Sequence, residues 1–119
     1  MENIKIFEVE YRFMCIVWDK EPISSTELVK ICQNELGWKK STTYTVIKRL
    51  SERGALKNKN AVVSSLVTRL QIQKHESEEI LKKTFDNSLP SFITAFLQDK
   101  KLSHDDAEQI KRVIEEMSK

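Results

Sequence analysis

The fold is decided by the stretch Trp38 to Leu56, which reads WKKSTTYTVIKRLSERGAL. Helical spacing places Thr43, Val46, Ile47, Leu50 and Arg53 on one side of a single helix. The opposite side carries short hydroxyls, one phenol and cations, namely Ser41, Tyr44, Thr45 and Lys48, with Thr42 and Arg49 at its edge. No carboxylate occurs before Glu52, whereas exposed helix faces usually mix both charge signs. The pattern favours a helix that packs on a core and contacts phosphates and base edges of DNA, over a plain basic surface helix.

Charge is unevenly distributed along the 119 residues. Residues 1–70 hold 12 Lys and Arg against 8 Asp and Glu, a balance of +4, and residues 71–119 hold 8 against 10, a balance of −2. Between Lys39 and Arg69 the only acid is Glu52, and this basic excess is expected where a polyanion binds. The residues predicted to contact DNA are Lys39, Lys40, Ser41, Thr42, Tyr44, Thr45, Lys48, Arg49, Lys57 and Lys59.

Composition excludes several classes of protein. Charged residues make up 32% of the chain and hydrophobic ones 39%, which is typical of a soluble globular protein. No apolar run is long enough to insert into a membrane, and the polar N-terminus is unlike a signal peptide, so we expect a cytoplasmic protein. Cys15 and Cys32 lie in apolar helical stripes and are predicted to be buried, reduced thiols. No metal site, cofactor site or catalytic set of side chains is recognisable, so an enzyme is not expected.

The first half of the chain predicts a helix-turn-helix. Apolar spacing gives a first helix over about Phe7–Asp19. Ser24 and Glu27 have the spacing of a capping box, which begins a second helix, and Gly37 ends it as a left-handed cap. The helix of the opening stretch follows after only a few residues, so the connection must be a sharp turn.

After Gly54 the spacing of apolar residues is no longer helical, and β-branched residues become frequent. This pattern predicts two antiparallel strands, Ala55–Lys59 and Ala61–Leu70, joined near Asn58–Asn60. A ribbon after the third helix makes residues 1–71 a winged-helix DNA-binding domain. Lys57 and Lys59 then lie near the phosphate backbone, with Asn60 as a further candidate. The alternative is a hairpin that only covers the core.

Residues 72–119 predict a helical domain that has too few apolar residues for a core of its own. Ser103, with Asp106 three residues further on, is predicted to cap its last helix. A second copy is the economical partner, because a two-fold dimer makes one apolar stripe self-complementary and places two recognition helices on a palindromic site in double-stranded DNA. The alternative is that these helices fold back on the first domain. The residues expected in a homodimer interface are Leu81, Phe85, Phe92, Phe96, Ile110, Val113 and Ile114.

The chain resembles the penicillinase-repressor family (BlaI/MecI type) over nearly its whole length. The resemblance is carried by an ordered set of short motifs: Glu10-Tyr11, Met14, Trp18, Ser24, Trp38, Thr42, Thr45, Ile47-Lys48-Arg49-Leu50, Gly54-Ala55-Leu56 and the segment from Phe96 to Ser103. It implies a mostly helical, homodimeric winged-helix repressor of β-lactam-resistance genes, which a membrane sensor of the antibiotic inactivates through proteolysis. It also implies base or phosphate contacts from Ser41, Thr42, Tyr44, Thr45 and Arg49.

The chain departs from the family pattern in several places. The third helix begins with Lys39-Lys40 instead of Ser-Pro, and the wing has Leu66-Val67 instead of an aromatic pair. The Asn-Phe cleavage site of the family corresponds to Ala95-Phe96, which makes this bond the candidate cleavage site. Two other functions stay open, a winged-helix regulator that responds to another signal and a helical protein-interaction adaptor.

Overall fold

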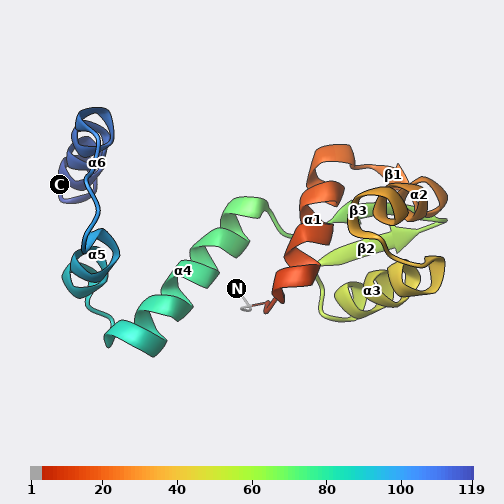
Figure 1. Ribbon diagram of the computed structural model, residues 1–119. Helices are drawn as coiled ribbons and strands as arrows, with labels where there is room; N and C mark the ends of the chain where they lie inside the picture. Colours follow the sequence, from red (N-terminus) through yellow and green to blue (C-terminus); the bar gives the residue numbers. More distant parts are fainter. Residues whose placement is uncertain (1–3) are drawn as a thin grey trace. The chain divides into compact units, whose positions relative to one another are not determined.

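The computed structural model describes residues 4–119, which form two compact units (Figure 1). The first unit ends at Ser77 and the second runs from Glu78 to Lys119. In chain order the elements are α1 (Glu8–Lys20), β1 (Ile23–Ser24), α2 (Ser25–Leu36), α3 (Lys40–Glu52), β2 (Leu56–Lys59), β3 (Val62–Ser65), α4 (Arg69–Phe85), α5 (Leu89–Leu97) and α6 (His104–Met117). The boundary between the units falls inside α4, as does the position after residue 71 that the sequence suggested.

The core of the first unit lies between α1, α2 and α3 and a small sheet (Figure 1). Its largest fully buried side chains come from all of these elements: Phe13, Met14 and Val17 of α1, Leu28 and Cys32 of α2, Thr43 and Leu50 of α3, and Leu56 and Val63 of the sheet. The apolar faces predicted for the first three helices are therefore the faces that pack together.

The sheet has three antiparallel strands in the order β1-β3-β2. Leu56 of β2 pairs with Ser65, and Ile23 of β1 pairs with Val63. The prediction of a ribbon after α3 is confirmed, but the two-residue strand β1 was not predicted. The turn also lies further along than expected, because its central residues are Asn60 and Ala61, both with positive φ as in a type I′ hairpin turn.

The predicted second strand was too long, because β3 ends at Ser65 and α4 begins at Arg69. A capping box explains this start. The Gln71 amide N–H donates to the Thr68 hydroxyl at 3.0 Å, and the Thr68 amide N–H donates to the Gln71 side-chain oxygen at 2.8 Å. These reciprocal bonds satisfy the first free N–H groups of α4, so the β-branched pair Val67-Thr68 leads into a helix rather than a strand.

Three other helix ends were predicted correctly. Ser24 accepts from the Glu27 amide at 3.2 Å at the start of α2, and Gly37 ends that helix with φ of +68°. Ser103 accepts from the Asp106 amide at 3.1 Å at the start of α6. Each bond involves residues close in sequence, so local pattern was enough to predict it.

The two cysteines differ in exposure. Burial raises the pKa of the Cys32 thiol to about 11, and the charge of Glu35 acts in the same direction. Cys15 is only half-buried, so the prediction that both thiols are buried was wrong for Cys15. Its position at the margin of the α1 apolar stripe explains the difference. Within residues 4–119 no helix has the length and apolar character needed to cross a membrane.

The second unit contains no buried residue from Glu78 to Lys119. Its best-packed feature is a row of aromatic rings. Phe85 meets Phe92 edge to face with ring centres 5.3 Å apart, and Phe92 stacks on Phe96 at 6.0 Å. On α6 an apolar stripe of Ile110, Val113, Ile114 and Met117 is exposed throughout.

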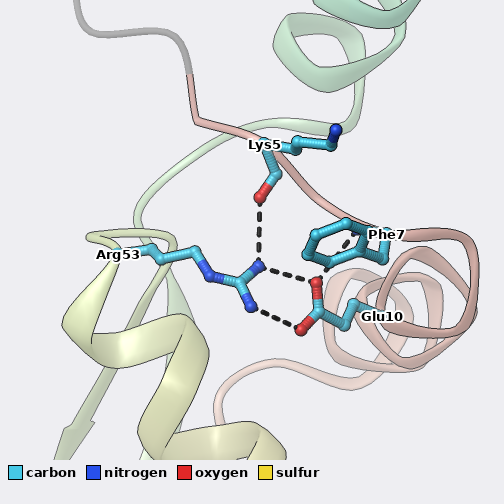
Figure 2. Close-up of polar contacts among 4 residues, drawn as sticks. All are labelled: Lys5, Phe7, Glu10 and Arg53. Atoms are coloured by element: carbon cyan, nitrogen blue, oxygen red, sulfur yellow. Dashed lines mark hydrogen bonds and ion pairs between the residues drawn. The ribbon is translucent and has the colours of Figure 1, made fainter.

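An ion pair ties the beginning of α1 to the end of α3 (Figure 2). The Arg53 guanidinium donates to the two carboxylate oxygens of Glu10 at 2.6 and 2.7 Å and to the Lys5 carbonyl oxygen at 3.1 Å. Glu10 also accepts from the Phe7 amide at 3.0 Å, which satisfies a free N–H at the start of α1. Glu10 is only 7% exposed, and this set of donors compensates its burial.

The pKa of Glu10 reflects this balance. Burial raises the pKa, but the hydrogen bonds from Arg53 and Phe7, with the charges of Arg53 and Arg49, outweigh burial and leave the pKa lowered. A carboxylate with a lowered folded-state pKa stabilises the fold at pH values above its unfolded-state pKa. This stabilisation is lost as the pH falls through the folded-state pKa.

We predict that Glu10→Gln lowers the free energy of unfolding by about 1–3 kcal/mol near neutral pH, because Arg53 loses its charged partner. The difference from the wild type should shrink in acid, where Glu10 itself becomes protonated. Urea denaturation at a series of pH values measures both effects. Asp19→Asn is the control, since the Arg69–Asp19 pair at 3.1 Å is exposed and should contribute less than about 1 kcal/mol. Equal losses for the two variants at every pH would contradict the assignment.

Candidate nucleic-acid interface

Helix α3 has one buried face and one exposed face. Thr43, Val46, Ile47 and Leu50 are buried, as the sequence predicted. The fifth member of that side, Arg53, follows the helix as its C-cap and pairs with Glu10. The exposed face displays the predicted contact residues Ser41, Thr42, Tyr44, Thr45, Lys48 and Arg49.

The connection from α2 fixes the position of α3. Gly37 adopts a left-handed conformation, and the amides of Gly37 and Trp38 both donate to the Cys32 carbonyl oxygen. The Trp38 ring stacks on Phe13 of α1, with ring centres 5.6 Å apart and planes 13° from parallel. The hydrogen bonds to the Cys32 carbonyl oxygen and the stacking of Trp38 on Phe13 restrict the rotation of α3, so its polar face stays outward.

Positive charge gathers at the N-terminal end of α3. Lys39 is the N-cap residue and makes no side-chain capping bond, and the first turn contains no acid. Lys39 and Lys40 are both exposed. Cations at this end oppose the helix dipole, and the free amide N–H groups there favour an anion. The arrangement is therefore unfavourable within the chain and becomes favourable when a phosphate is bound nearby.

Two hydroxyls on the exposed face already have partners. Thr45 Oγ1 donates to the Ser41 carbonyl oxygen at 2.9 Å, so its lone pairs stay free to accept a bond from a base. Tyr44 OH donates to Ser25 Oγ at 3.5 Å, a long bond that links α3 to the start of α2. These bonds hold both side chains in place before any ligand arrives.

Strand β2 places a polar residue, Asn58, beside α3, and the sequence pattern had not singled it out. Lys57 and Lys59 are exposed as predicted, but alternation along the strand places them on the face opposite Leu56. Asn58 shares the face of buried Leu56 and lines a hollow together with residues of α3. Side chains alternate between the two faces of a strand, so counting from the apolar Leu56 would have placed Asn58 on the same face.

The residues predicted for a dimer interface all lie in or after the last turns of α4. Leu81, Phe85 and Phe92 are half-buried, and Phe96, Ile110, Val113 and Ile114 are exposed. Ala95 and Phe96 occupy the last turn of α5, where the Ala95 carbonyl oxygen accepts from the Gln98 amide at 3.3 Å. Among residues 4–119 no cluster of His, Cys, Asp or Glu could hold a metal ion.

Three helices with a helix-turn-helix connection and a three-stranded antiparallel sheet define a winged helix-turn-helix domain. A solved structure supports this class, namely the solution structure of the Bacillus licheniformis BlaI monomeric form in complex with the blaP half-operator. It matches with a TM-score of 0.52 and 24% sequence identity, and the match covers 60% of this chain and 93% of that chain.

The chain belongs to the penicillinase repressor family, whose model matches residues 6–116. It is similar to the methicillin resistance regulatory protein MecI of Staphylococcus aureus, with 26% identity over 117 residues and coverage of 95% of each chain. A penicillinase repressor of Bacillus licheniformis is 22% identical over 116 residues, covering 94% of this chain and 91% of that protein. The family is one of transcriptional repressors and not of enzymes.

Proposed function

We propose that this protein is a sequence-specific, DNA-binding transcriptional repressor of β-lactam-resistance genes. The observation that carries the proposal is the exposed face of α3, which is polar, cationic and free of acids before Glu52. The names of the relatives support the same function, since one is a methicillin resistance regulatory protein and another is a penicillinase repressor. A repressor of this kind works in the cytoplasm, where the chromosome is.

We assign different roles to the exposed face of α3 and to its N-terminal end. Thr45 lies on the exposed face of α3, and Arg49 lies one helical turn further along at the edge of that face. Both are proposed to contact base edges in the major groove, together with Thr42 and Tyr44. Lys39, Lys40 and Ser41 surround the N-terminal end and are proposed to contact phosphates. Lys57 and Lys59 on the wing strand are proposed to add phosphate contacts on the flanking duplex.

Alanine variants separate these roles. Arg49→Ala and Thr45→Ala should reduce discrimination by about 1–3 kcal/mol at one base pair per half-site, because a contact to a base edge is lost. Lys40→Ala should weaken binding to every sequence alike, because a phosphate contact carries no sequence information. Competition binding with a selected duplex and a scrambled duplex measures both. Equal losses on the two duplexes for all three variants would contradict base reading by α3.

We further propose that the second unit dimerises with a second copy of the chain. The support is its exposure: no residue from Glu78 onward is buried, and Ile110, Val113, Ile114 and Met117 form a continuous apolar stripe on α6. Exposed apolar stripes of this kind mark interaction surfaces. A two-fold dimer would present two α3 helices to the half-sites of a palindromic operator.

The dimer proposal predicts that Ile114→Asp yields monomers at micromolar concentration. Ile114 is 57% exposed, so its replacement removes little packing within one chain but places a charge in the proposed interface. Arg112→Gln changes the net charge by the same amount on the opposite side of α6 and should leave the dimer intact. Sedimentation of both variants and of Phe92→Ala measures the outcome. A dimer that survives Ile114→Asp and Phe92→Ala would place the interface elsewhere.

For induction we propose that a β-lactam sensor pathway leads to cleavage between Ala95 and Phe96. A cut there would detach α6 with its apolar stripe and leave too little apolar area to hold two copies together. The avidity of two linked half-site contacts would then be lost, which is commonly a factor of 100 or more. Because the bond lies in the last turn of α5, this turn must open before a protease can bind it. An intact chain recovered by mass spectrometry from derepressed cells would contradict this mechanism.

A further inference from the structure

A hollow of about 480 Å³ lies between α3 and β2. These two elements pack against each other in the first unit (Figure 1). Its lining residues are Tyr44, Ile47, Lys48, Ser51, Glu52 and Asn58. The hollow is therefore bordered on one side by α3, where its exposed face meets its buried face at Ile47, and on the other side by a single wing residue, Asn58.

The hollow offers several hydrogen-bond donors and one positive charge. No acidic side chain in the described part of the chain pairs with the Lys48 ammonium group, so it remains available to a ligand. The Asn58 side-chain amide approaches the hollow from β2, and Tyr44 lines it one helical turn before Lys48. Ser51 Oγ, which also lines the hollow, is buried without a hydrogen-bond partner among residues 4–119. A buried hydroxyl in this state is costly unless a ligand or water completes its bonding.

We infer that this hollow binds one phosphate group of duplex DNA, held between the Lys48 ammonium group and the Asn58 side-chain amide. The inference rests on the proposed DNA-binding function and adds Asn58 as a contact residue. A lysine acts on a phosphate as a point charge, and an amide N–H on the far side fixes the position of the anion. Placed between the recognition helix and the wing, the site would hold the sugar-phosphate strand that borders the major groove.

Glu52 limits where the phosphate can lie. Its carboxylate lines the same hollow, one helical turn after Lys48, and repels an anion at that end. The phosphate is therefore held near Lys48 and Asn58. The competing assignment is that Glu52 accepts a hydrogen bond from a cytosine amino group, in which case the hollow would read a base.

The test uses a duplex that the wild-type protein selects from a randomised pool, synthesised with one neutral methylphosphonate at a time. For the wild type, one position per half-site should weaken binding roughly ten-fold or more, as expected for a charge-assisted contact. Asn58→Ala and Lys48→Ala should each bind the unmodified duplex roughly ten-fold more weakly. The DNA-binding affinity of these two variants should fall little further when that same phosphate is neutralised.

Asn34→Ala is the matched control, because it removes the same amide group from an exposed residue of α2 that does not line the hollow. It should keep the full sensitivity to that phosphate. Glu52→Gln should strengthen binding to all duplexes alike, whereas a loss of preference at one base pair would overturn the phosphate assignment in favour of base reading. If neutralising one phosphate weakens DNA binding by the wild type and weakens binding by Asn58→Ala to the same extent at every position, the assigned site is wrong. The proposed function would still stand. A wild type that binds no duplex would overturn both.

Discussion

Helix α3 must bury one face while it leaves the other free, and the rest of the first unit depends on this constraint. Its apolar face, with Val46, Ile47 and Leu50, completes the core that α1, α2 and the sheet form. The stacked pair of Trp38 and Phe13 holds its beginning, and the ion pair of Arg53 with Glu10 holds its end. A helix fixed at both ends presents its polar face in a single orientation, so contacts to a ligand need no large rearrangement of the backbone.

The second unit differs from the first, because it is a helical segment whose apolar side chains are left exposed. The aromatic row of Phe85, Phe92 and Phe96 orders the turn between α4 and α5, but it excludes little water. A segment of this size cannot offset its ordering entropy without further burial. The charge balance differs as well, since the negative excess of residues 71–119 contrasts with the positive excess before them. The two units thus present different surfaces, a cationic one on the first and an apolar one on the second.

The sequence predicted those features that depend on neighbouring residues. The two faces of α3, the caps at Ser24, Gly37 and Ser103, and the ribbon after α3 all follow from short-range pattern. Strand β1 was not predicted because two residues are too few to show an alternating pattern. Only their pairing with Val62 and Val63 makes them a strand. The bond between Glu10 and Arg53 joins residues 43 positions apart, so no local signal reports it. The roles of individual residues at the interface and in the second unit remain predictions.

The central claim is that the first unit binds duplex DNA through its cationic surface, and the salt dependence of binding tests it most directly. Each phosphate that Lys39, Lys40, Lys48 or the wing lysines neutralise should contribute roughly −0.9 to the slope of log K against log salt concentration. A dimer with a few such contacts per copy should therefore give a slope of several negative units. Titration of a selected duplex between low and moderate salt measures this slope. A slope near zero, or no binding at low salt, would contradict the account.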